Sequence, residues 1–164
     1  MEPAPIVRPA ARVILFDPDD RVLLFEALVP PRSKPSRVRS IWITPGGGLQ
    51  PGETYEEAVR RELWEETGLR DAEIGPCVWT RDHVFEWKGR LIDQRERYYV
   101  ARCERFELDS RNWQPEEMTF LLRHRWWAID EILTSADVFV PGRMGEALKE
   151  LLRGYPSEPI AMGV

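Results

Sequence analysis

Apolar positions along this chain fall into short runs that predict strands on both sides of one amphipathic helix. Two β-branched runs at 12–17 and 22–28 flank the turn segment Asp17-Pro18-Asp19-Asp20, an arrangement typical of a β-hairpin. Further strands are predicted at 41–44, 72–81, 83–87, 91–102 and 125–128, and further helices at 130–133 and 145–152. The runs at 83–87 and 91–102 form a second predicted hairpin around Lys88-Gly89.

The central helix is predicted over 55–67 because start and stop signals frame it. Thr54 is a suitable N-cap, and Glu57 follows three residues later, which is the capping-box spacing. Gly68 stands where a C-cap glycine belongs. A helix of this length has room for two distinct faces.

Carboxylates lie on the apolar face of this helix, where a packing face should have none. At about 100° per residue, Glu62 and Glu66 fall in the middle of that face and Glu65 at its edge. The apolar residues of the same face are Tyr55, Ala58, Val59 and Leu63. Burial of unpaired carboxylates is costly, so the cluster calls for a cation, and clustered oxygen ligands suit Mg²⁺ or Mn²⁺. A salt-bridged acidic helix is the alternative.

The stretch from Gly47 to Leu69 resembles the Nudix box, with the pattern G-x5-E-x7-R-E-U-x-E-E-x-G-U, where U is apolar. The positions that match are Gly47, Glu53, Arg61, Glu62, Leu63, Glu65, Glu66, Gly68 and Leu69. All the fixed positions are met, so the chain is similar to the MutT-like Nudix hydrolases. The resemblance implies an α/β fold, an α/β/α sandwich around a central mixed β-sheet.

The resemblance also implies a reaction, the hydrolysis of a nucleoside diphosphate linked to another group X. Depending on the group X, the substrate would be a nucleoside triphosphate, a nucleotide sugar or a similar molecule. Mg²⁺ or Mn²⁺ held by Glu62, Glu65 and Glu66 would neutralise the phosphate oxygens and activate a water. A backbone carbonyl in the glycine-rich turn is a metal ligand in this family, which points to Gly46 here. These four residues are the predicted metal ligands, and the three glutamates are also predicted catalytic residues.

Two further box residues and one acid outside the box complete the predicted site. The family's pattern implies an ion pair between Glu53 and Arg61 that locks the preceding loop onto the helix. The general base is expected in the box or in a later loop or strand. Glu117 is the preferred candidate outside the box, with Glu116 and Glu96 as the others; Gln94 and Glu96 share one face of the run 91–102.

Two other functions compete with the hydrolase hypothesis. A catalytically silent Nudix-fold domain would bind nucleotides as a sensor or interaction module, but such domains usually lack a box carboxylate and this chain lacks none. An isomerase with the Nudix fold would need cysteine and acid positions in their own contexts, which Cys77 and Cys103 do not show. The hydrolase is therefore the preferred hypothesis.

Composition limits the remaining options. The 164 residues predict one domain over 1–164, with loose tails at 1–9 and 154–164. The net charge of −5 argues against a stable nucleic-acid partner, although the loop 29–39 is basic. No apolar run predicts a membrane span and the N-terminus does not resemble a signal peptide, so a cytoplasmic location with reduced cysteines is expected. A small nucleotide is the expected partner, and no segment decides whether the chain forms a homodimer.

Overall fold

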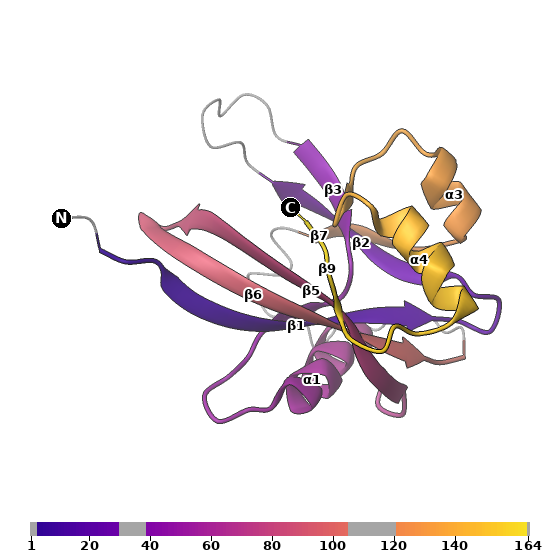
Figure 1. The fold of residues 1–164 in the computed structure, drawn as a ribbon, viewed down its shortest axis with the longest axis horizontal. Helices are drawn as coiled ribbons and strands as arrows, with labels where there is room; N and C mark the ends of the chain where they lie inside the picture. Colours follow the sequence, from indigo (N-terminus) through magenta and orange to yellow (C-terminus); the bar gives the residue numbers. More distant parts are fainter. Residues whose placement is uncertain (1–2, 30–38, 105–120, 164) are drawn as a thin grey trace.

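The computed structural model describes residues 3–29, 39–104 and 121–163. Within them nine strands form one mixed, strongly curled sheet (Figure 1). The strands are β1 (Ile6–Phe16), β2 (Val22–Val29), β3 (Arg39–Ile43), β4 (Gly46–Gly48), β5 (Glu73–Trp87), β6 (Arg90–Arg102), β7 (Leu121–Trp127), β8 (Phe139–Val140) and β9 (Ile160–Ala161). The helices are α1 (Tyr55–Thr67), α3 (Ile129–Thr134) and α4 (Met144–Arg153).

The strand order is β8-β3-β2-β1-β6-β5-β9, with β4 added to β1 and β7 added to β2. The pairs β1–β6, β3–β8 and β5–β9 are parallel, and the other pairs are antiparallel. The centre of the sheet is β1, which pairs with β2, β4 and β6. The glycine-rich turn that forms β4 is therefore attached directly to the central strand.

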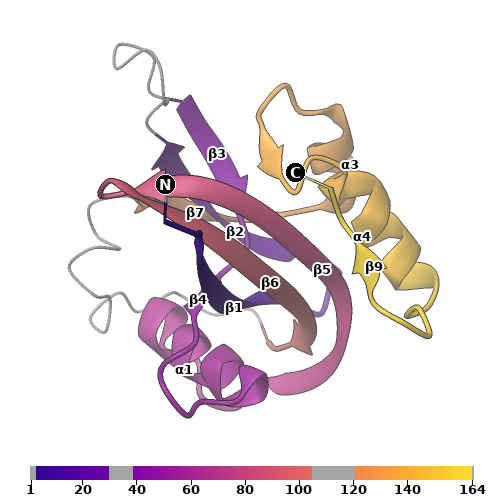
Figure 2. The same ribbon diagram turned by 60° about the vertical axis from the view of Figure 1, so that its left-hand side comes forward.

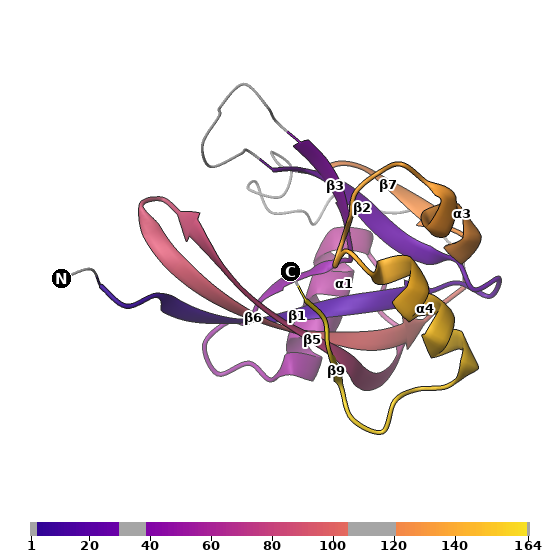
Figure 3. The ribbon, with the colours of Figure 1, turned by 45° about the horizontal axis from the view of Figure 1, so that its top comes forward.

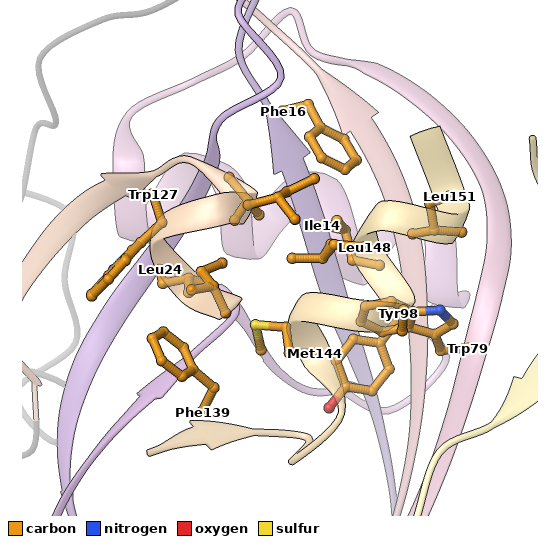
Figure 4. Close-up of a cluster of buried hydrophobic side chains, with 14 of the residues drawn as sticks. Ile14, Phe16, Leu24, Trp79, Tyr98, Trp127, Phe139, Met144, Leu148 and Leu151 are labelled. Atoms are coloured by element: carbon orange, nitrogen blue, oxygen red, sulfur yellow. The ribbon is translucent and has the colours of Figure 1, made fainter. Parts of the chain in front are cut away.

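Helices cover both faces of the sheet, as Figures 2 and 3 show. Side chains of a strand alternate between the two faces, so Val13 and Leu15 of β1 pack towards α1, while Ile14 and Phe16 pack towards α4. Figure 4 shows the core on the α4 side of the sheet, where Met144, Leu148 and Leu151 of α4 pack against the strands. This arrangement confirms the α/β/α sandwich with a central mixed sheet.

Both predicted hairpins are present, with one difference. Phe16 pairs with Val22 across the first turn, and β5 and β6 pair antiparallel around Lys88 and Gly89. Lys88 and Gly89 both have positive φ (49° and 77°), which is the requirement of a tight hairpin turn. The predicted interruption at residue 82 was wrong, since β5 is continuous there and the exposed Asp82 pairs with Arg95.

The prediction of loose tails was also wrong for the parts that join the sheet. Residues 6–9 lie in β1 and pair with β6. At the other end β9 pairs with the edge strand β5, as Figure 3 shows. The backbone N–H of Met162 donates to the Thr80 carbonyl oxygen (2.7 Å), and the Met162 side chain is buried. Unpaired edge groups of β5 and the burial of one methionine thus order the C-terminal segment.

Three of the tryptophans belong to the core. Trp42, Trp79 and Trp127 are buried, and the rings of Trp42 and Trp127 meet edge to face with centroids 5.1 Å apart. Trp87 at the end of β5 is exposed, and Trp113 lies outside the described residues. The three buried rings are therefore unsuited to stack on a nucleotide base.

Candidate functional site

Helix α1 has the bounds predicted from its capping residues. The Thr54 hydroxyl accepts a hydrogen bond from the Glu57 backbone N–H (3.1 Å), and a Glu57 carboxylate oxygen accepts one from the Thr54 N–H (3.2 Å). Gly68 ends the helix with φ of 79°, the left-handed conformation that glycine adopts at low cost. Local sequence thus sets both ends of α1.

The acidic residues of α1 lie where the helical periodicity places them. Glu62 and Glu66 are each 4% exposed, and Glu65 is partly buried. Their neighbours Val59 and Leu63 belong to the core between α1 and the sheet. Two carboxylates are thus held against the packed face of the domain, away from bulk water.

One oxygen of Glu62 is unsatisfied. Glu62 Oε1 accepts a hydrogen bond from Arg61 Nη1 (3.0 Å), whereas Oε2 is buried and has no hydrogen-bond partner among the described residues. A Cβ added at Gly47 would lie only 2.6 Å from Glu62 Oε1, so a side chain at this position would displace the Glu62 carboxylate. A buried carboxylate oxygen without a donor is costly unless a cation binds it, and a divalent metal ion fits this requirement.

Gly46 contacts the acidic face of the helix at Glu66. Its backbone N–H donates to Glu66 Oε2 (3.0 Å). Its φ is 142°, and an added Cβ would lie 2.2 Å from the Ala11 carbonyl oxygen. Only glycine fits here, and it brings the Gly46 backbone to the end of the carboxylate cluster.

Arg61 joins the preceding loop to the acidic face. Its guanidinium contacts both oxygens of Glu53 (2.8 and 3.0 Å), Glu62 (3.0 Å), Glu65 (3.1 Å) and the Gly48 carbonyl oxygen (2.9 Å). The predicted ion pair between Glu53 and Arg61 is therefore present. Hydrogen bonding to Arg61 lowers the pKa of Glu53.

Glu65 is in a less favourable environment for a charge. Burial, followed by the negative charge of Glu62, raises the pKa of Glu65, and Arg61 offsets this only in part. Among the described residues, no three acidic, histidine or cysteine side chains converge as a ready set of metal ligands. In this structure the cation that contacts Glu62 and Glu65 is the Arg61 guanidinium.

A second polar cluster is centred on Glu96 of β6. Glu96 is 2% exposed and contacts Arg12 Nε (2.6 Å), Arg81 Nη1 (2.7 Å) and His83 Nε2 (3.3 Å). Burial alone would raise the pKa of Glu96, but the charge of Arg12, the contact with His83 and the hydrogen bonds from Arg12 and Arg81 outweigh burial and hold it well below the usual range. Glu96 is therefore an ionised anchor and a weak proton acceptor.

Comparison with known proteins agrees with this geometry. A family model described as the NUDIX domain matches residues 7–150. The chain belongs to the NUDIX family. Its relatives include the RNA pyrophosphohydrolase of Caulobacter vibrioides (strain NA1000 / CB15N), which is 30% identical over 167 residues, with 90% of this chain and 87% of that protein covered. The RNA pyrophosphohydrolase of Afipia carboxidovorans is 37% identical over 70 residues, and that match covers 38% of this chain but only 42% of the relative.

Solved structures support the Nudix fold. The MutT protein from Methanosarcina mazei Go1 superposes with a TM-score of 0.63 at 16% identity, covering 93% of this chain and 97% of that one. The C. elegans Ap4A hydrolase has a TM-score of 0.59 at 20% identity, covering 89% and 96% of the two chains. With the family established, this Nudix protein is a hydrolase of the pyrophosphatase type.

The structure does not describe every residue predicted for the Nudix site. Glu117, Glu116 and most of the basic loop 29–39 lie outside the described residues. His83 stacks on Phe85 (5.4 Å between centroids) and His124 meets Phe25 edge to face (6.4 Å).

In the part of the chain that is described, no helix is long and apolar enough to cross a membrane.

Sequence reasoning missed Arg12 and Arg81 as members of a polar cluster. The available signal is that Gln94 and Glu96 are two residues apart and so share one face of β6. Both polar side chains are buried there. The partners are distant in sequence, since Arg12 and Glu96 are 84 positions apart. Only the register of β1 beside β6 brings them together.

The depressed pKa of Glu96 predicts a pH dependence of stability. The folded pKa lies below the ordinary value of 4.5, so in acid the unfolded chain takes up this proton first, and stability falls as pH drops through that window. We expect Glu96→Gln to be less stable than wild type at pH 7, with the difference shrinking as pH falls below about 4.5. Urea unfolding of both proteins at a series of pH values measures this, and a difference that stays constant with pH would contradict it.

Proposed function

We propose that this Nudix hydrolase uses Mg²⁺ or Mn²⁺ to cleave the diphosphate linkage of a nucleoside diphosphate derivative. The observation that carries the proposal is the buried pair Glu62 and Glu66, with Glu62 Oε2 lacking a hydrogen-bond partner among the described residues. A cation satisfies this oxygen, and the substrate diphosphate brings the negative charge that such a cation neutralises.

The residues that would hold the metal are all oxygen donors. Glu62, Glu65 and Glu66 supply carboxylates and Gly46 supplies a backbone carbonyl, the ligand types that Mg²⁺ and Mn²⁺ prefer. When bound, the metal supplies Lewis acidity at the phosphate oxygens and a water of lowered pKa. Burial of the glutamates against the α1 core keeps their carboxylates in place before substrate arrives.

Other residues of the chain support these ligands and the substrate. Arg61, tied to Glu53, holds the loop against α1. Arg8 of β1 lies directly against Gly48, since an added Cβ there would be 2.7 Å from its guanidinium, and its Nη1 donates to Gln94. The positive charge of Arg8 at this turn suits the binding of a substrate phosphate.

Glu117 is the proposed general base outside the box. Glu96 is unsuited to this role because its depressed pKa makes it a poor proton acceptor. We expect Glu117→Gln to lose the acidic limb of the pH–rate profile of kcat/KM, since that limb reports ionisation of the base. A profile that keeps the limb would exclude Glu117.

The substrate class is proposed from the relatives and from the chemistry of the site. Nucleoside triphosphates and nucleotide sugars carry the required diphosphate. The RNA pyrophosphohydrolase relative that matches 90% of this chain adds a 5′-polyphosphorylated RNA end as a candidate. The two cysteines are free, which fits action in the cytoplasm, and a homodimer is to be tested by light scattering.

A substrate panel tests the proposal. Wild-type protein is incubated with nucleoside triphosphates, 8-oxo-dGTP, ADP-ribose, nucleotide sugars, dinucleoside polyphosphates and a short 5′-triphosphorylated RNA. Each is assayed with Mg²⁺, with Mn²⁺ and with a chelator, and products are separated by chromatography. Metal-dependent cleavage between phosphates is expected for at least one class. Cleavage that persists in the chelator would contradict the metal requirement.

A further inference from the structure

The Gly46 turn is held from two sides, and only one side belongs to the Nudix box. On the box side, Glu66 accepts the Gly46 N–H. On the other side, Arg12 Nη1 donates to the carbonyl oxygens of Thr44 (3.2 Å) and Gly46 (3.3 Å). The Arg12 Cδ lies so close that a Cβ at Gly46 would be 2.9 Å from it. The orientation of the Gly46 carbonyl therefore depends on where Arg12 places its guanidinium.

Arg12 is itself held by Glu96. The Arg12 Nε lies 2.6 Å from Glu96 Oε2, and the two side chains are 17% and 2% exposed. Glu96 is anchored in turn by Arg81 (2.7 Å). The Arg12 guanidinium therefore contacts Glu96 through Nε and the turn through Nη1. A planar guanidinium with several N–H donors can make both contacts at once.

Neutralisation of Glu96 does not by itself explain the position of Arg12, because Arg81 already provides a positive charge at the other carboxylate oxygen. The contacts that distinguish the two arginines are those to the turn. Arg12 donates to the Thr44 and Gly46 carbonyl oxygens, whereas Arg81 donates to Glu96. Glu96 also offsets part of the positive charge that Arg12 and Arg81 bring near the Gly46 carbonyl, which reduces the repulsion of a metal ion there.

We propose that Arg12, oriented by Glu96, is a positioning residue that aims the Gly46 carbonyl at the metal. This inference rests on the proposed function, in which that carbonyl is a metal ligand. A carbonyl oxygen has two lone pairs, so it can accept from Arg12 and still bind a cation. Partners that orient metal ligands in this way typically change metal affinity by about 10- to 100-fold when they are removed.

A matched pair of variants separates positioning from general support of the cluster. Arg12→Met and Arg81→Met each leave Glu96 with one arginine, but only Arg12→Met releases the turn. Mn²⁺ alone is titrated into each protein by calorimetry, without substrate, and thermal unfolding is recorded in parallel. We expect similar unfolding temperatures, a Kd for Mn²⁺ about tenfold weaker in Arg12→Met, and a change below about twofold in Arg81→Met.

Arg12→Lys serves as the second variant if Arg12→Met does not fold. It keeps a cation beside Glu96 but replaces the fork by a single nitrogen, so the same weakening of Mn²⁺ binding is expected. Unchanged Mn²⁺ affinity in a folded Arg12 variant would overturn the inference, as would an equal loss in Arg12→Met and Arg81→Met. If wild type binds Mn²⁺ and hydrolyses a substrate, such a result overturns the inference alone. If wild type does neither, the proposed function fails with it.

Discussion

Replacing Glu62 by glutamine is expected to lower kcat about a thousandfold at saturating metal and substrate. The amide keeps the shape of the side chain but removes its negative charge from the acidic face of α1. Metal stabilisation of transition-state charge contributes several kcal/mol, and about 4 kcal/mol corresponds to a factor of a thousand in rate. The measurement is a steady-state rate on the best substrate of the panel, with metal varied up to saturation.

Glu56→Gln is the matched control for this experiment. Glu56 lies on the same helix but is 64% exposed at its side chain and pairs only loosely with Arg60 (3.6 Å). Its replacement should leave kcat unchanged within about twofold, since exposed surface substitutions have small effects. A Glu62→Gln variant that retains a rate near that of Glu56→Gln would show that Glu62 does not hold the catalytic metal.

Replacing Arg61 by methionine is expected to lower the free energy of unfolding by about 3 kcal/mol, the lower end of the cost of breaking a buried ion pair. Arg61 is 19% exposed and contacts three carboxylates and the Gly48 carbonyl. Without it, Glu53, Glu62 and Glu65 are left close together with no cation between them. Urea unfolding at pH 7 in a chelating buffer measures the loss.

Arg60→Met supplies the reference for Arg61→Met. Arg60 is the preceding residue of the same helix, is 50% exposed and has two long contacts, to Glu56 (3.6 Å) and to the Ala72 carbonyl oxygen (3.5 Å). Its removal should cost less than about 0.5 kcal/mol. Equal losses in the two variants would mean that Arg61 does not stabilise the loop and the acidic face.

The parts of the site that could be predicted from sequence are those fixed by local rules. Thr54, Glu57 and Gly68 set the ends of α1, and once the ends are known the helical period places Glu62 and Glu66 on the buried face. The contact between Arg61 and Glu53 spans eight residues and follows from the same helix and its loop. Each of these features depends on chain neighbours and on little else.

The features that sequence did not reveal depend on strand register between distant segments. Arg12 meets Glu96 only because β1 and β6 pair in parallel. The tail 154–164 was expected to be loose, and its strand β9 has only two residues, too few for a sequence pattern to predict. Its order comes from the open edge of β5 and from burial of Met162. The local sequence pattern predicts neither the pairing of β9 with β5 nor the burial of Met162.

Whether the buried acidic face of α1 holds the divalent metal is tested most directly by titrating Mn²⁺ into wild type and Glu66→Gln and following the free ion by electron paramagnetic resonance. Wild type and the control Glu56→Gln are expected to bind Mn²⁺, and the Kd of Glu66→Gln is expected to be at least about tenfold weaker, since a charged ligand is lost. Equal binding by Glu66→Gln and wild type, with both proteins folded, would contradict this and place the metal elsewhere.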